Sequence, residues 1–456
     1  MLLDPVILSR IQFAFTIGFH IFFPTLTIGL SLYLVYMEWK WLRTQSLVYL
    51  QQYKFWIQVF ALAFGIGVVS GVVMAYQFGT NFSSFIVKTG NVIGPLLSFE
   101  VLSAFFLEAG FLGIMLFGWN KVGPKLHFFA TLMVSVGTLI SAFWILSANS
   151  WMQTPQGHTI DENGIFFAEN WLQIIFNPSF SYRYVHMILA SIITASFVMA
   201  GIAGFYLLKN IHPRFSRNSL SMILWVVLIA VPVQIFLGDA HGLNTKEHQP
   251  MKIAAIEAIW ETEMGADLVL FGIPDQQNKK TDYKISIEKG ASLLLTHELD
   301  GEVEGLNMIP QKDWPPVAPV FFSFRIMVGI GVIFLVMALW GTWLRIRGRL
   351  FENKFYHFLL VCVSPLGFVA TIAGWCVTEM GRQPYVVYGL VRTADSISPV
   401  SGEKVLISLS LFIIVYTALF IAFLIYMFKT IGKGPDLMED PQFQYPKTSF
   451  GHIIKG

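Results

Sequence analysis

The sequence predicts an all-α integral membrane protein with nine transmembrane helices. Its 456 residues are 55% hydrophobic and only 13% charged, whereas soluble domains carry about 25% charged residues. Nine apolar runs are each long enough to cross a bilayer as a helix. Lysines and arginines gather after every second run, as expected of alternating membrane crossings. We expect two four-helix bundles plus one peripheral helix.

The apolar runs divide one membrane domain, residues 1–456, into three groups. In chain order they are 12–37, 55–80, 93–118, 127–150, 182–208, 219–238, 320–343, 356–378 and 405–428. Helices 1–4 occupy 12–150, helices 5–7 occupy 182–343 and helices 8–9 occupy 356–428. The segment 239–319 is a long connection, and 429–456 is a tail. The first run lacks the basic flank and cleavage site of a signal peptide.

The positive charges predict the orientation of the chain. They follow each odd-numbered run, as at Lys40, Lys121, Lys209, Arg345 and Lys429. The positive-inside rule therefore places the N-terminus outside and the C-terminal tail in the cytoplasm. The segment 239–319 is then an outer loop.

This topology predicts that chemically capable residues share one depth. They are His20, Glu100, His186, Arg325, Met327 and Glu379, each expected roughly 6–13 Å from the outer boundary at about 1.5 Å per residue. Charged side chains within a membrane are costly and usually functional.

The stretch from Gly374 to Tyr385 ends an apolar run with a carboxylate, Glu379, and an arginine, Arg382. We interpret it as part of a functional site, with Trp375 and Arg382 as cofactor contacts. The alternative is an interfacial anchor in which Trp375 and Tyr385 lie among the lipid headgroups.

Histidine and methionine side chains in an apolar bundle are suited to binding haem iron. His186 and Met327 are candidate ligands of a six-coordinate haem that transfers electrons, and Arg325 is a candidate partner for its propionate. His20 and Glu379 would then serve haems with an open position for dioxygen. Singly, a methionine or histidine is more often a core residue, so the prediction depends on the shared depth.

Two glutamates predict a route for protons. Glu100 is a third candidate ligand or a carboxylate beside the iron, and Glu108 follows eight residues later, about 80° around an α-helix. Glu108 would lie nearer the midplane and relay protons from the cytoplasm, with Ser141 and His127 as extensions. The alternative is a helix–helix hydrogen bond from a protonated acid.

The outer loop begins at Gly238-Asp239-Ala240-His241-Gly242 and continues into a short helical pattern with Lys252 and Glu257. A site that oxidises quinol needs a proton acceptor and a hydrogen-bond donor to the quinone oxygens, and these residues supply both. The alternative is a solvated helix with an exposed ion pair. Residues 275–304 are polar without periodicity, so we expect a mobile flap.

Together these residues resemble subunit I of the cytochrome bd-type quinol oxidases, from Ile7 to about Gly389. The motifs that carry the resemblance are Phe19-His20, the Glu100/Glu108 helix, Arg183-Tyr184-Val185-His186, Gly238–Gly242, Gln249–Ala258, Phe324-Arg325-Ile326-Met327 and Glu379–Pro384. The sequence departs from the family at Tyr385, where tryptophan is usual. Its outer loop is short, similar to the branch with an abbreviated Q-loop, some members of which are called cyanide-insensitive.

The resemblance implies three haems, b558, b595 and d (or a third b-type haem). By position, His186 and Met327 match the ligands of b558, and His20 and Glu379 match ligands of the two high-spin haems. Glu100 matches a carboxylate beside them, and Lys252 and Glu257 match the quinol-site pair.

The family reduces dioxygen to water with quinol and without copper, in the bacterial cytoplasmic membrane. It takes protons from the cytoplasm and generates protonmotive force without pumping. The resemblance also implies a second large subunit and a small single-helix subunit, with no nucleic acid as partner.

Three other functions fit the residues less well. A b-type cytochrome subunit of a quinone oxidoreductase would leave Glu100 and Glu379 without a role. A proton-coupled transporter would have repeat-related broken helices around midplane sites. A haem–copper oxidase is disfavoured because the membrane histidines fall on four separate helices, at His20, His127, His186 and His357.

Overall fold

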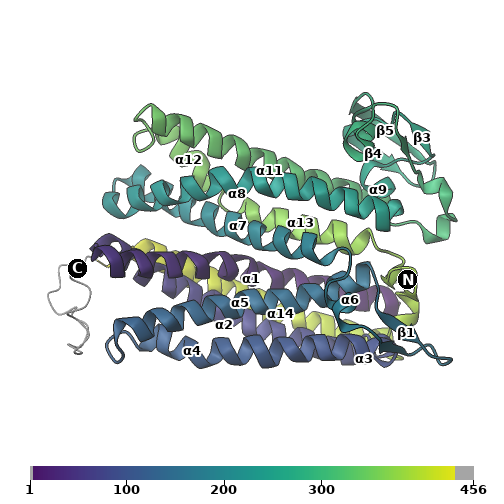
Figure 1. Ribbon diagram of the computed structural model, residues 1–456, viewed down its shortest axis with the longest axis horizontal. Helices are drawn as coiled ribbons and strands as arrows, with labels where there is room; N and C mark the ends of the chain where they lie inside the picture. Colours follow the sequence, from purple (N-terminus) through teal and green to yellow (C-terminus); the bar gives the residue numbers. More distant parts are fainter. Residues whose placement is uncertain (1–3, 437–456) are drawn as a thin grey trace.

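The computed structural model of the chain describes residues 4–436. Within this range nine helical spans are long and apolar enough to cross a membrane, as predicted. Figure 1 shows the spans side by side, with α1 (Pro5–Thr44) starting at the end of the bundle that carries the strands. We call this the outer end, after the topology that the positive charges predict, and the opposite one the inner end. Residues 437–456 of the predicted tail lie outside the described residues.

The helices form two groups of four with one peripheral helix, as predicted. The first group contains α1, α2 (Leu47–Thr80), the continuous span of α3 (Ser83–Glu100), η1 (Val101–Phe105) and α4 (Phe106–Phe117), and α5 (Pro124–Gln153). The second contains α7 (Phe180–Lys209), α8 (Pro213–His248), α11 (Val317–Ile346) and the span of α12 (Lys354–Val363) and α13 (Leu366–Met380). The last helix, α14 (Gly402–Lys433), packs against α1 and α2.

The two groups meet where α1 packs on α7, and small residues let the two backbones approach closely. A Cβ built on Gly29 would lie 2.3 Å from the carbonyl oxygen of Ser191 and 2.7 Å from Cβ of Ala195. A larger residue at this position would push α1 away from α7. Nearby, the hydroxyls of Tyr33 and Ser196 are 2.7 Å apart and bond across the same interface.

The helices extend beyond the predicted runs, because hydropathy marks only the part of a helix that lies in lipid. α1 begins with Pro5 in its first turn, where the Asp4 side chain accepts a hydrogen bond from the backbone N–H of Val6. α8 continues to His248 instead of ending at residue 238. The Gly238–Gly242 motif is therefore helical, and the expectation that it opens the outer loop is wrong.

Two spans depart from a regular α-helix. The run predicted at 356–378 is divided into α12 and α13 at Pro365, which lacks the N–H that would continue the helical ladder. The Ser364 hydroxyl donates to the carbonyl of Val361 at this break, 2.9 Å. The run predicted at 93–118 contains η1, a π-helical segment that directly follows Glu100.

Short elements cover the outer end. After α9 (Pro250–Glu257), β3 (Glu263–Met264) pairs with β6 (Glu302–Val303), and β4 (Leu268–Asp275) pairs with β5 (Lys280–Ile287). The others are β1 (His158–Ile160), β2 (Phe166–Ala168), α6 (Trp171–Ile175), α10 (Gly290–Thr296), η2 (Leu306–Met308), η3 (Gln311–Asp313), β7 (Tyr385–Val387), β8 (Val391–Arg392) and η4 (Ala394–Ser396). Regular elements thus occupy most of residues 275–304, although the sequence there shows no strong periodicity.

Candidate functional site

His20 of α1 is held in one orientation by α2. Its Nδ1 lies 2.9 Å from the hydroxyl of Ser70, which itself donates toward the carbonyls of Ile66 and Gly67. Because a hydroxyl has one proton, Ser70 accepts from Nδ1–H, and Nε2 carries the lone pair that a metal needs. Gly71 leaves room for the ring, since a Cβ there would lie 3.1 Å from Cε1 of His20.

His186 and Met327, the predicted haem pair, also each face a glycine on a neighbouring helix. A Cβ on Gly238 of α8 would lie 3.3 Å from Cε1 of His186, and a Cβ on Gly374 of α13 would lie 2.7 Å from Sδ of Met327. Nδ1 of His186 is buried without a hydrogen-bond partner among the described residues. The glycines of α8 and α13 therefore leave space for the side chains of His186 and Met327.

Glu379, near the end of α13, receives bonds from α5. Its Oε1 accepts from Nδ2 of Asn149 at 2.8 Å and from Nε2 of Gln153 at 3.3 Å. Its Oε2 forms an ion pair with Arg382. Trp375 lies one helical turn before Glu379 and is partly buried.

Arg382 has capacity for a second anion. Its Nε and Nη1 are buried without a partner in the part of the chain that the structure describes, although buried arginine nitrogens are normally all bonded. Burial lowers the pKa of Arg382, and Glu379 opposes that shift. A group with negatively charged oxygens, such as a haem propionate, would satisfy these two nitrogens.

Glu100 and Glu108 both face α5. Oε1 of Glu100 accepts from the Ser141 hydroxyl at 2.8 Å, and a Cβ on Gly137 would lie 2.4 Å from Cγ of Glu108. We predicted about 80° between the two glutamates from α-helical geometry. The π-helical turns of η1 are wider, so each residue rotates by less, and both carboxylates come to one face.

The predicted common depth holds less well for Glu100. The residue that binds it, Ser141, lies eight residues along α5 from Asn149, which binds Glu379. At the helical rise, Glu100 is about 12 Å nearer the inner end than Glu379.

Lys252 and Glu257 of α9 are buried, with only 3% and 6% of their surfaces exposed. Nζ of Lys252 donates to Oε1 of Gln153 and to Oε1 of Gln249, each at 2.7 Å. Burial holds the pKa of Lys252 well below its usual range, and Arg183 and Arg382 lower it further. The alternative of a solvated helix with an exposed ion pair is therefore wrong.

Glu257 faces α11, whereas Lys252 faces Gln153 of α5. Its Oε2 lies 3.1 Å from Nη2 of Arg325, which also bonds the carbonyl of Ile256 through Nη1 at 2.7 Å and that of Val269 through Nε at 2.9 Å. Burial raises the pKa of Glu257, and Arg325 opposes the shift. Arg325 thus contacts α9 and β4 rather than standing free for a propionate.

Gln153 was not predicted, yet it joins the two halves of the site. Its amide oxygen accepts from Lys252 and its amide nitrogen donates to Glu379. A neutral glutamine at a helix end carries no signal in a sequence. The glycines facing the candidate ligands could have been found by asking which small residues share their predicted depth.

Partly buried histidine, methionine and carboxylate side chains among the nine spans of residues 4–436 define a multi-pass helical protein of the kind that holds haem within a membrane. The model of the family described as "Cytochrome bd terminal oxidase subunit I" matches residues 8–435. The chain belongs to this family, and membership implies haem cofactors.

Relatives match over nearly the full chain. It is 36% identical over 446 residues to the cytochrome bd ubiquinol oxidase subunit 1 of Bacillus subtilis (strain 168), covering 95% of both chains. It is 29% identical to the cytochrome bd-II ubiquinol oxidase subunit 1 of Escherichia coli (strain K12), covering 96% of this chain and 98% of the relative. The protein is a multi-pass protein of the bacterial inner membrane.

The fold agrees with a solved structure. The bd oxidase from Geobacillus thermodenitrificans superimposes with a TM-score of 0.88 at 31% identity, over 95% of this chain and 99% of that chain. The architecture of the whole membrane domain is therefore that of a bd oxidase.

Proposed function

We propose that this chain is the haem-bearing subunit of a quinol oxidase that oxidises a membrane quinol at the outer end and reduces dioxygen to water with cytoplasmic protons. Protons released outside and consumed from inside generate a protonmotive force without pumping. The observation that carries the proposal is the amide of Gln153, which bonds Lys252 on one side and Glu379 on the other.

Lys252 and Glu257 form the quinol site in this proposal. Two of the three N–H donors of a charged Lys252 are used by Gln153 and Gln249, so one donor remains for a quinol oxygen. Burial lowers the pKa of Lys252 and raises the pKa of Glu257, and shifts of this kind are typical of groups that exchange protons with a substrate. The two groups would act on a quinol from different sides of α9.

The haem sites follow from the spaces beside the glycines. His186 and Met327 would hold haem b558. His20 and Glu379 would hold the two high-spin haems, b595 and d or a third b-type haem, with Glu100 beside them. Haem, when bound, supplies the one-electron chemistry and the open coordination position that side chains lack.

α5 carries the proposed route for protons. From the inner end outward, His127 bonds Glu38 at 2.7 Å, Gly137 accommodates Glu108, and Ser141 bonds Glu100. His127 and Glu38 are fully buried. Glu38, Glu108 and Glu100 come from α1, α4 and α3 and lie beside successive levels of α5, as a relay from the inner end requires.

The chain would work with a second large subunit and a small single-helix subunit. The names of its relatives describe each of them as one subunit of an oxidase.

A reduced-minus-oxidised spectrum of the purified complex, together with oxygen uptake driven by quinol, tests the proposal. We expect one low-spin and two high-spin haems and uptake that needs no copper. A folded complex without haem absorbance, or one reduced by quinol that consumes no oxygen, would contradict it. The second outcome would favour a quinone oxidoreductase that only transfers electrons.

A further inference from the structure

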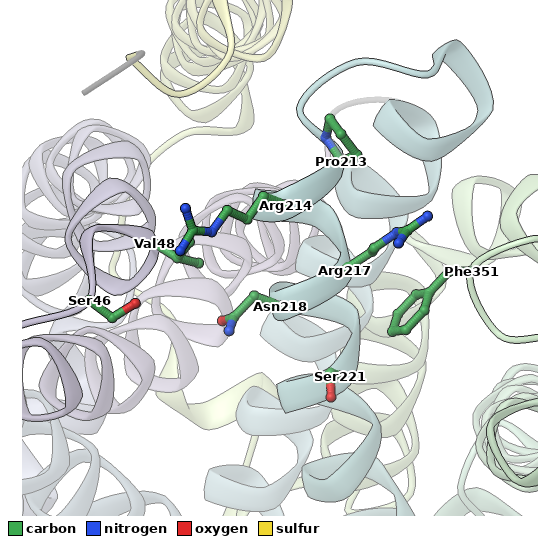
Figure 2. Close-up of a pocket in the computed structure, with 8 residues that line it drawn as sticks. All are labelled: Ser46, Val48, Pro213, Arg214, Arg217, Asn218, Ser221 and Phe351. Carbon is green, nitrogen blue, oxygen red and sulfur yellow. The ribbon is translucent and has the colours of Figure 1, made fainter. Parts of the chain in front are cut away.

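A pocket of about 650 Å³ opens at the inner end of the bundle, far from the site described above. Figure 2 shows it between the first turns of α8, the start of α2 and the segment that follows α11. Its polar lining is formed by Ser46, Arg214, Arg217, Asn218 and Ser221, with Phe351 at one side. No aspartate or glutamate is among its lining residues.

Two polar side chains of the pocket have hydrogen-bond donors available to a ligand, because their own acceptor oxygens already bond other residues. Oδ1 of Asn218 accepts from Nε2 of Gln52 at 2.8 Å, which leaves the Asn218 amide N–H groups for a ligand. Oγ of Ser221 accepts from Nη2 of Arg345 at 2.9 Å, which leaves the hydroxyl proton. A ligand that carries several acceptor oxygens would match this lining.

Arg214 and Arg217 supply two positive charges to the same pocket. Both side chains are exposed, and neither forms an ion pair with another described residue. The Arg217 guanidinium lies 5.6 Å from the ring centroid of Phe351, within the range of a cation–π contact. Arginine binds phosphate oxygens with two parallel N–H groups, so the charge and donors together indicate a phosphate group.

An exposed apolar stripe leads away from the pocket along α8. At intervals of four residues, Arg217 and Ser221 are followed by Trp225, Ile229 and Val233, whose exposed fractions are 59%, 65% and 40%. Neighbours at this spacing contact each other on the helix surface, and each lies about 40° further around the helix, so the stripe winds slowly around α8. From Arg217 to Ile229 the stripe is about 18 Å long, comparable with the roughly 15 Å apolar depth of one leaflet.

We propose that this pocket binds the phosphate group of an anionic phospholipid of the inner leaflet, with its acyl chains along Trp225 and Ile229. A soluble phosphate would use the arginines but not the stripe, which is why the lipid is favoured. Basic pockets between helices at this side of a membrane commonly bind anionic headgroups. The site is separate from the proposed oxidase chemistry and does not depend on it.

The test uses the purified complex with its partner subunits, delipidated in detergent and titrated with phosphatidylglycerol while native mass spectrometry counts bound lipid. The double variant Arg214→Gln/Arg217→Gln should bind phosphatidylglycerol at least about tenfold more weakly. The matched control is Arg347→Gln/Arg349→Gln, which removes the same charge from exposed arginines at the same end. It should retain wild-type affinity within about twofold. Equal loss in both variants would overturn the pocket and indicate general surface charge.

Two further arms separate a lipid from free phosphate. Trp225→Ala should weaken phosphatidylglycerol binding, and 10-fold excess inorganic phosphate should not displace the lipid from the wild type. Displacement by inorganic phosphate, with no effect of Trp225→Ala, would overturn the lipid proposal in favour of a soluble anion. If the arginine variant loses its haem absorbance, the wild-type complex is labelled with a photoactivatable phosphatidylglycerol instead. Labelling at residues 217–229 supports the site, and labelling only elsewhere overturns it.

Discussion

Nη2 of Arg325 lies 3.1 Å from Oε2 of Glu257, so a buried arginine of α11 holds a buried glutamate of α9. Burial raises the pKa of this carboxyl group, and the arginine counteracts the shift. Two opposing effects therefore set the pKa of Glu257. Burial raises it by removing solvent, and the neighbouring positive charge of Arg325 lowers it. A group balanced in this way is suited to taking a proton from a substrate.

Glu257→Ala should slow quinol-driven oxygen uptake by about 100-fold, because a positioned acid or base contributes about 10²–10⁴ to a rate. Uptake with an artificial donor that reduces haem directly should stay near wild type. Steady-state rates with both donors provide the measurement. Glu261→Ala is the control, since Glu261 is exposed four residues further along. Equal losses with the two donors would remove Glu257 from the quinol site.

The pH dependence of the same reaction should respond to Arg325. Deprotonated Glu257 is the form that accepts a proton, so the quinol-driven rate should fall as pH drops through its raised pKa. Removing the opposing charge in Arg325→Gln raises that pKa further, and the acidic limb of the profile should move to higher pH. The measurement is kcat/KM for quinol against pH. An unmoved limb would mean that another group titrates there.

The sequence predicts the chemical type of Lys252 and Glu257 but not the side chains that they contact. Lys252 and Glu257 follow from a short helical pattern, yet five residues place them about 140° apart on α9. They therefore face different helices, Lys252 toward Gln153 and Glu257 toward Arg325. Partners of this kind come from segments distant in the chain, which local periodicity does not relate.

The bounds and the irregular turns of the helices also could not be predicted from the sequence. The nine spans of the described residues follow from hydropathy alone, since each needs the length and apolar composition that a bilayer demands. The π-helical turns after Glu100 and the start of α1 at Pro5 depend on packing and capping outside the apolar runs. The predicted angle between Glu100 and Glu108 was wrong because of the π-helical turns, and the predicted first helix began too late because its capped first turns lie outside the apolar run.

Gln153→Leu should slow quinol-driven uptake by about tenfold while leaving the haem spectrum in place. The substitution removes one acceptor of Lys252 and one donor to Glu379, and a hydrogen bond to a charged group contributes about 1.5–3 kcal/mol. Gln156→Leu, at an exposed position three residues away, is the control. Wild-type quinol kinetics in Gln153→Leu would show that the amide link has no functional role.

His186→Ala and Met327→Leu should each abolish the low-spin haem signal and leave most of the high-spin haem. Loss of either axial ligand prevents six-coordination of the iron that the pair would hold. Optical and electron paramagnetic resonance spectra of the purified complex measure both haem types. A low-spin spectrum retained in both variants would refute the ligand assignment.

Gly374→Ala should perturb the same haem without touching a ligand. The new Cβ would lie 2.7 Å from Sδ of Met327, closer than packed atoms tolerate, so the thioether must move. Overpacking of this kind costs about 1–3 kcal/mol, and we expect a shifted low-spin band and a lowered midpoint potential, since thioether ligation raises the potential. Gly329→Ala is the matched control, because its Cβ would meet nothing within 4 Å on the helix that carries Met327. If both alanine variants keep the wild-type band and potential, the space that Gly374 leaves is not needed for methionine ligation.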